Sequence, residues 1–142
     1  MFTSDRTSNK GKYGSTISGY LLAAVSCAVF GAIYECFSHG VYSCFMIGAS
    51  AFPLLFGALA FRLLQKYGKP FPGKLAENFI CAGVAALTVG SIVQGVLEIY
   101  GTANPLVTGY WIAGGLLTAI GWLAAWHEKN TATYGKRRKH IG

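Results

Sequence analysis

Charged residues are scarce in this chain. Of its 142 residues, 12% are charged, whereas hydrophobic residues make up 53%. A soluble domain of average composition contains about 25% charged residues. The shortage of charge therefore argues against an ordinary soluble domain and favours a protein that lies largely within a lipid bilayer.

Acidic residues are fewer still. Five acidic residues stand against twelve lysines and arginines, which gives a net charge of +7. A nucleic-acid-binding protein would gather its basic residues into one patch or stripe. In this sequence they instead flank long apolar segments, as they do in membrane proteins. We therefore expect no nucleic-acid partner.

The known signatures of catalysis and cofactor binding are also missing. No nucleophile elbow, zinc-protease, phosphate-loop or dinucleotide-binding pattern stands in a suitable context. The four cysteines form no CxxC pair. The apolar segments contain no pair of histidines that would ligate a haem. We expect a non-enzymatic protein with no catalytic residue, no cofactor and no metal site.

What the chain does contain is four long apolar segments. About 20 apolar residues are needed to cross the hydrocarbon core of a bilayer. The sequence predicts an all-α integral membrane protein, a bundle of four transmembrane helices within residues 17–126. The expected spans cover residues 17–37, 41–64, 79–100 and 106–126. Pro53 should kink the second span or loosen one of its hydrogen bonds, because proline lacks an N–H group.

The two ends of the chain are basic and polar. We expect residues 1–16 to form a disordered tail and residues 127–142 to form a second tail. All twelve lysines and arginines lie in these tails or in residues 62–74. The positive-inside rule therefore predicts that both tails and the middle loop are cytoplasmic. Short turns and the lack of a glycosylation sequon fit a bacterial cell membrane.

A basic cluster stands near the C-terminus. It is either a plain topology signal or a contact with anionic lipid headgroups, which attract basic residues near the membrane surface. Its members are Lys136, Arg137, Arg138 and Lys139.

The sequence contains an apparent internal repeat. Residues 32–40 match residues 95–103 in character at an offset of 63, and residues 45–49 match residues 110–114 at an offset of 65. We interpret this as a duplicated helical hairpin, with parallel copies related by a pseudo-twofold axis along the membrane normal. The alternative is chance similarity between two apolar hairpins that draw on a restricted alphabet.

Small residues recur every four positions in the first and third expected spans. They are Ala24, Ala28 and Ala32 in the first span and Ala82, Ala86 and Gly90 in the third. Such stripes allow membrane helices to approach closely. We therefore expect the first and third spans to meet at the centre of the bundle.

Two glutamates occupy equivalent repeat positions, Glu35 and Glu98, in the last turn of an outward-running helix. A carboxylate there faces the negative end of the helix dipole, at a cost of about 0.3–1 kcal/mol. Either the two reach water at the outer surface, or they share a cation or a proton in a common vestibule. His39 and Gln94 are near enough in sequence to join such an ion or proton site.

Two cysteines flank the first turn. Cys36 and Cys44 could form a disulfide in an oxidising compartment or remain free thiols. The sequence leaves both possibilities open.

Two functions remain. The first is a small accessory or interaction subunit that associates in the lipid bilayer with copies of itself or with another membrane protein, because its Gly- and Ala-rich faces permit close helix contact. The second is a small cation or proton transporter or channel that uses Glu35 and Glu98.

Overall fold

The computed structural model describes residues 2–37, 39–40, 43–67 and 71–141. Every regular element in this part of the chain is a helix. In order they are α1 (Phe2–Phe37), α2 (Cys44–Phe52), η1 (Pro53–Leu59), α3 (Ala60–Lys66), α4 (Lys74–Tyr100) and α5 (Leu106–Ile141). The elements α2, η1 and α3 follow one another without a break, and together they are called the second rod below.

Four helices are long and apolar enough to cross a membrane, as in a multi-pass membrane protein. Their apolar stretches are Lys10–Phe37, Cys44–Lys66, Lys74–Tyr100 and Leu106–Glu128. The prediction of an all-helical chain with four such helices is confirmed. Many of their large apolar side chains are exposed, Leu22, Ile112 and Leu123 among them. That pattern suits helices whose outer faces meet lipid tails rather than water.

The N-terminal residues differ from their expectation. Residues 2–16, expected to be a disordered tail, form the first part of α1. Near the end of this stretch, Tyr13 is only 3% exposed. Its ring meets that of Phe71 edge-on, with centroids 4.9 Å apart. The residues of the second tail are also helical, because α5 continues to Ile141.

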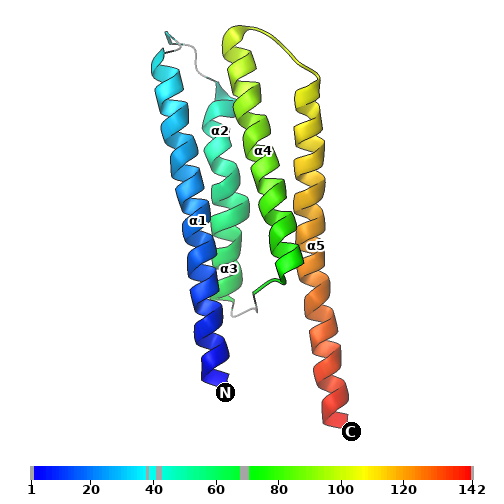
Figure 1. The fold of residues 1–142 in the computed structure, drawn as a ribbon. Helices are drawn as coiled ribbons and strands as arrows, with labels where there is room; N and C mark the ends of the chain where they lie inside the picture. Colours follow the sequence, from blue (N-terminus) through cyan, green and yellow to red (C-terminus); the bar gives the residue numbers. More distant parts are fainter. Residues whose placement is uncertain (1, 38, 41–42, 68–70, 142) are drawn as a thin grey trace.

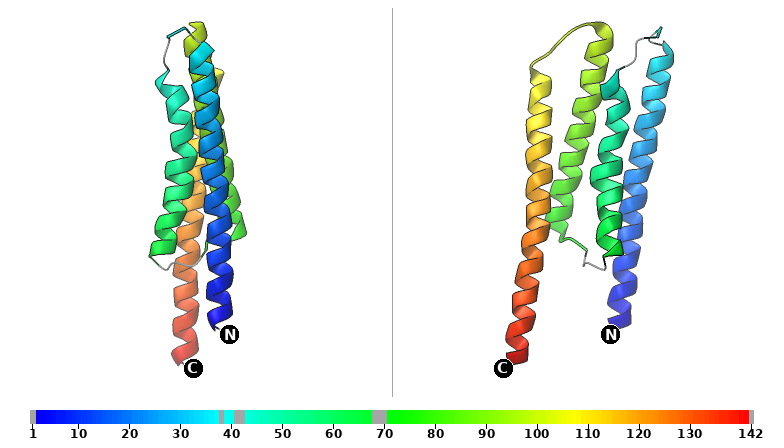
Figure 2. Two further views of the ribbon diagram at one scale, coloured as in Figure 1. Left: turned by 90° about the vertical axis from the view of Figure 1, so that its left-hand side faces the viewer. Right: turned by 180° about the vertical axis from the view of Figure 1, so that it is seen from behind.

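The helices stand in a row in the order α1, second rod, α4, α5 (Figures 1 and 2). Close backbone contacts join α1 to the rod, the rod to α4, and α4 to α5; among the described residues none joins α1 to α4 or α1 to α5. Both chain termini lie at the same end of the helices, called the inner end of the row below (Figure 1). The opposite end of the helices is called the outer end. The expected meeting of the first and third spans at the centre is therefore wrong.

The small residues of α4 explain this outcome, because they face α5 and the second rod instead. Gly83 packs against Thr118, and a Cβ added to Gly114 would stand 2.9 Å from the backbone nitrogen of Leu87. A Cβ added to Gly95 would stand 3.1 Å from the backbone nitrogen of Met46 in the rod. Both neighbours of α4 are therefore drawn close by glycine.

The order of the helices can also be compared with the pseudo-twofold axis that the apparent repeat predicts. A pseudo-twofold axis would pair the contact between the rod and α4 with an equivalent contact between α5 and α1. The described residues make the first contact and not the second. The two hairpins, α1 with the rod and α4 with α5, thus stand one after the other.

Pro53 opens a π-helical segment, Pro53–Leu59, in the middle of the second rod. Proline cannot donate the usual helical hydrogen bond, so the turn widens. The disturbance expected at Pro53 is found. Gly57 in the widened turn packs directly on the ring of Tyr20, where a Cβ would collide with that ring.

Aromatic rings fill the face of the row between the second rod and α5. Phe45 and Phe52 both meet Trp111, with centroids 6.0 and 5.6 Å apart. Phe61, fully buried, meets Trp122 with centroids 6.0 Å apart. These rings bridge two helices whose backbones make no close contact in the described part of the chain.

The inner end of α4 is joined to α5 by a capping contact. Glu128 Oε2 accepts a hydrogen bond of 2.8 Å from the backbone N–H of Gly73, which precedes α4. A carboxylate is favoured there by the positive end of the helix dipole. This contact fixes where α4 begins relative to α5.

Candidate functional site

The outer end of the row holds the predicted glutamates. Glu98, in the last turn of α4, is exposed, but one of its oxygens has a partner. Ser43 Oγ donates a hydrogen bond of 2.7 Å to Glu98 Oε2. Nearby, Ser91 Oγ donates one of 2.6 Å to the carbonyl oxygen of Phe45. Two hydroxyl groups thus tie the outer end of α4 to the start of the second rod.

The other predicted residues surround this end of the row. Glu35 is half-buried in the last turn of α1, and Gln94 is half-buried on α4. Tyr34, beside Glu35, contacts Tyr100 through its phenol group, so the outer ends of α1 and α4 are bridged. His39 is exposed in the turn, with Nδ1 2.9 Å from the carbonyl oxygen of Phe37.

These groups do not form a metal centre. Among the described residues, no three His, Cys, Asp or Glu side chains lie close enough together to hold a metal ion. All four cysteines fall within the described part, and each is a free thiol there, Cys36 and Cys44 included.

The basic cluster near the C-terminus belongs to the last turns of α5. Its side chains lie outside those that the structure describes, so a contact with headgroups stays a prediction. The residues are Lys136, Arg137, Arg138 and Lys139.

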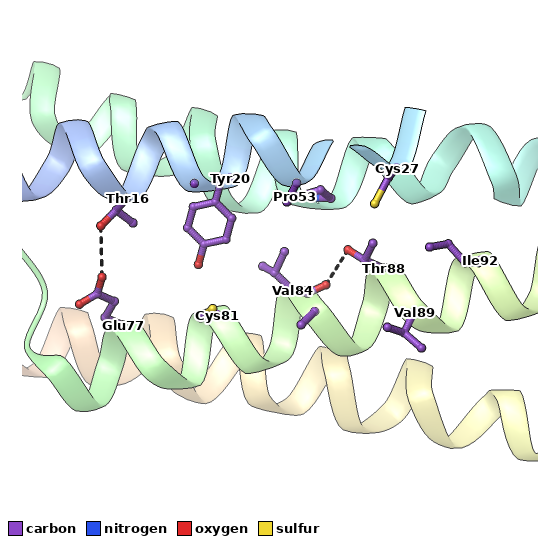
Figure 3. A pocket seen from close by; sticks show the side chains of 13 residues that line it. Thr16, Tyr20, Cys27, Pro53, Glu77, Cys81, Val84, Thr88, Val89 and Ile92 are labelled. Atoms are coloured by element: carbon purple, nitrogen blue, oxygen red, sulfur yellow. Dashed lines mark hydrogen bonds between the residues drawn. The ribbon is translucent and has the colours of Figure 1, made fainter. Parts of the chain in front are cut away.

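One feature that the sequence did not indicate is a groove between α1 and α4. It has a volume of about 580 Å³ and is open along one side. One wall carries Ala23 and Cys27 of α1, the opposite wall carries Ala85 and Ile92 of α4, and Pro53 of the rod lies between them (Figure 3). Its lining is almost wholly apolar. Apart from Tyr20, no aromatic side chain is among the described residues that line the groove, whereas aromatic rings fill the opposite face of the row.

Three polar groups line the inner half of this groove. Thr16 Oγ1 donates a hydrogen bond of 3.2 Å to Glu77 Oε1, which spans the gap between α1 and α4 (Figure 3). The side chain of Tyr20 is only 9% exposed, and its hydroxyl points across the groove towards Cys81. Within the described residues, no hydrogen bond of regular geometry satisfies that hydroxyl. The groove therefore offers one enclosed polar group to whatever fills it.

Sequence reasoning missed Ser43, Tyr20 and Glu77 as contributors to these sites. Ser43 carried a usable signal, because a serine directly before an apolar run is a common helix N-cap. Its side chain makes no capping bond and bonds to Glu98 instead. Tyr20 and Glu77 gave no comparable signal, because their pairing depends on which faces of α1 and α4 point at each other.

Comparison of the chain with protein-family models, with curated proteins and with solved structures finds no match.

Proposed function

We propose that this chain is a non-enzymatic membrane protein that assembles side by side with further copies of itself. Four long apolar helices support its insertion in a bilayer. All lysines and arginines lie in the two tails or in residues 62–74, and both termini lie at the inner end (Figure 1). That placement supports an orientation with the inner end in the cytoplasm of a bacterial cell.

The observation that carries the proposal is the open row. Within the described part of the chain, the second rod and α4 each have two neighbours in close backbone contact, whereas α1 and α5 each have one. The two helices at the edges of the row expose small residues. These are Ala28 and Ala32 on α1, and Gly109 and Ala113 on α5. A Cβ added to Gly109 would meet nothing within 4 Å. Small exposed residues let another helix approach closely.

The apparent repeat supplies the register for such a contact. Ala28 and Ala32 correspond, at the offset of 63, to Ser91 and Gly95, which α4 places against the second rod. Ala113 corresponds, at the offset of 65, to Gly48, whose added Cβ would lie 3.8 Å from Ser91 Oγ. We therefore expect α5 to meet α1 of the next copy as the rod meets α4. Such a head-to-tail contact produces a ring or a filament.

The polar groups of the two edges match in the same way. Thr108 corresponds to Ser43 at the offset of 65, and Glu35 corresponds to Glu98 at the offset of 63. Thr108 is exposed at the start of α5. We expect its hydroxyl to donate to Glu35 of the next copy, as Ser43 donates to Glu98. The repeated glutamates would then act as hydrogen-bond acceptors between successive hairpins.

Co-purification of two differently tagged copies from one membrane tests the proposal. We expect both tags to be recovered together in mild detergent. Ala28→Leu should abolish recovery of the second tag, because the added bulk separates the helices. Ser26→Leu is the matched control, since Ser26 is exposed on another face of the same helix. Recovery of one tag alone from the unaltered chain would contradict self-assembly.

Transport of a cation or a proton through Glu35 and Glu98 is the second candidate. The contact between Tyr34 and Tyr100 favours it, because these residues neighbour the two glutamates on the facing helix ends. Flux into proteoliposomes tests this candidate. A flux that is unchanged in the double variant Glu35→Gln plus Glu98→Gln would exclude the pair as the transport site.

A further inference from the structure

We infer that the groove between α1 and α4 binds one anionic phospholipid, with an acyl chain along the groove and the phosphate at its inner end. This inference goes beyond self-assembly and concerns a different face of α1. The groove uses Tyr20, Ala23 and Cys27, whereas the proposed contact between copies uses Ala28 and Ala32.

The acyl chain is expected from the shape and lining of the groove. The groove runs along the helices from Thr16 at the inner end to Ile92 (Figure 3). Its volume of about 580 Å³ falls within the range of roughly 300–1,000 Å³ that is usual for ligand sites. An apolar groove that is open to the side in a transmembrane helix row faces lipid tails directly. An acyl chain is therefore the occupant that the bilayer itself supplies.

The phosphate is expected from a second hollow at the inner end. This hollow, of about 510 Å³, shares Thr16 and Glu77 with the groove, so the two adjoin. Its rim adds Lys12, Ser15 and Lys74. Ammonium and hydroxyl groups are donors to phosphate oxygens. The apolar groove and the basic hollow together match the two parts of an amphipathic phospholipid, its acyl chain and its phosphate.

The charges around the hollow favour an anionic headgroup. Lys12 and Lys74 are exposed and face it from α1 and from the first turn of α4. Glu77 and Glu128 are the opposing charges, and one oxygen of each is already engaged, by Thr16 Oγ1 and by the N–H of Gly73. The two exposed lysine ammonium groups therefore attract a phosphate and repel a headgroup with its own quaternary ammonium.

Tyr20 lies between these two parts. Along α1 it follows Thr16 by one turn and precedes Cys27 (Figure 3). Its enclosed hydroxyl lacks a regular hydrogen bond within the described residues. In a bound phospholipid, the ester carbonyls lie between phosphate and acyl chain, at the depth of this hydroxyl. Tyr20 would donate to one of these ester oxygens.

The test titrates delipidated protein with phosphatidylglycerol, with phosphatidylcholine of the same acyl chains and with glycerol phosphate, and counts bound molecules by native mass spectrometry. We expect one phosphatidylglycerol to bind more tightly than either of the other two. Lys12→Gln plus Lys74→Gln should weaken its binding about thirtyfold, since each lysine near a lipid phosphate contributes roughly fivefold. Arg62→Gln plus Lys66→Gln removes the same charge from α3 and should leave binding unchanged.

The groove is tested by filling it. Ala85→Phe places a ring in the groove and should prevent binding, whereas Ala82→Phe, exposed outside the groove, should not. Tyr20→Phe keeps the ring packing and should weaken binding about fivefold, the value of one hydrogen bond. Melting temperatures in detergent establish that each variant is folded.

Three results would overturn the inference: equal binding of phosphatidylcholine, equal binding of glycerol phosphate, or unaltered affinity in the two-lysine variant. Each is independent of whether tagged copies co-purify, so failure of the lipid site and failure of self-assembly are distinguishable.

Discussion

Ser43 and Glu98 join the two hairpins at the outer end of the row through a hydrogen bond of 2.7 Å. Ser43 is 2% exposed, so its hydroxyl lies within the interface between the second rod and α4. A carboxylate in the last turn of a helix is opposed by the helix dipole. The hydroxyl donor offsets that cost and explains why α4 tolerates Glu98 there.

Removing this donor should weaken the contact between the hairpins. We expect Ser43→Ala to lower the free energy of unfolding in detergent by about 1 kcal/mol, the scale of hydrogen bonds between membrane helices. Ser50→Ala is the control, because the Ser50 hydroxyl donates to the carbonyl oxygen of Ile47 in its own helix. In the Glu98→Gln background, Ser43→Ala should cost less. An equal cost in both backgrounds would show that the pair is not coupled.

Glycine at the interface of α4 and α5 should not tolerate a side chain. A Cβ at Gly83 would collide with Thr118, and Gly114 O would lie 2.9 Å away. We expect Gly83→Ala to lower the free energy of unfolding by about 1–3 kcal/mol, as overpacking does.

Gly115→Ala is the matched control for Gly83→Ala, since nothing lies within 4 Å of the added Cβ. It should leave stability unchanged or raise it by up to about 1 kcal/mol, because alanine favours the helix. Equal melting temperatures for the two variants would contradict the packing of α4 on α5.

Phe61 should be the aromatic residue whose loss costs most at the inner end. It is fully buried and contacts the rings of Tyr13, Tyr20, Phe71 and Trp122. Phe61→Ala should cost about 3–5 kcal/mol through the cavity that it leaves. It should also alter the fluorescence of Trp122. Phe37→Ala removes a ring that is 78% exposed and should change neither quantity.

Thr108 should matter for assembly and not for the fold of one copy. Its side chain is exposed at the start of α5. Thr108→Val keeps the shape and removes the hydroxyl, which should weaken association by roughly 0.6 kcal/mol per contact. Energy transfer between labelled copies in liposomes measures this change. The control is Thr102→Val, because Thr102 is exposed in the neighbouring turn. An equal loss of association in both variants would show that Thr108 does not lie in the interface.

The sequence predicted the four apolar helices because span length and the placement of charge are direct constraints of a bilayer. It could not predict which faces of these helices pack together. In lipid, apolar residues cover every face, so no amphipathic stripe marks the interface. Gly83 and Gly95 both belong to α4, yet the first meets α5 and the second meets the rod. The expected close backbone packing of the first span on the third failed for this reason.

The candidate site was foreseen only in part. The equivalent positions of Glu35 and Glu98 were visible in the sequence, whereas the partner of Glu98 was not. Ser43 lies 55 residues away from Glu98, and only the order of helices in the row brings them together. Likewise, polar composition suggested a disordered N-terminus, but a single ring, that of Tyr13, packs into the core there.

Intermolecular disulfide formation between positions 28 and 113 tests the central claim, self-assembly through the open edges, most directly. In a chain whose four native cysteines are replaced, one copy carries Ala28→Cys and a differently tagged copy carries Ala113→Cys. The account predicts a mixed dimer when the two variants are present in one membrane, because α5 of one copy meets α1 of the next. It predicts little dimer from either variant alone. Absence of the mixed dimer, or equal dimer formation by either variant alone, would contradict it.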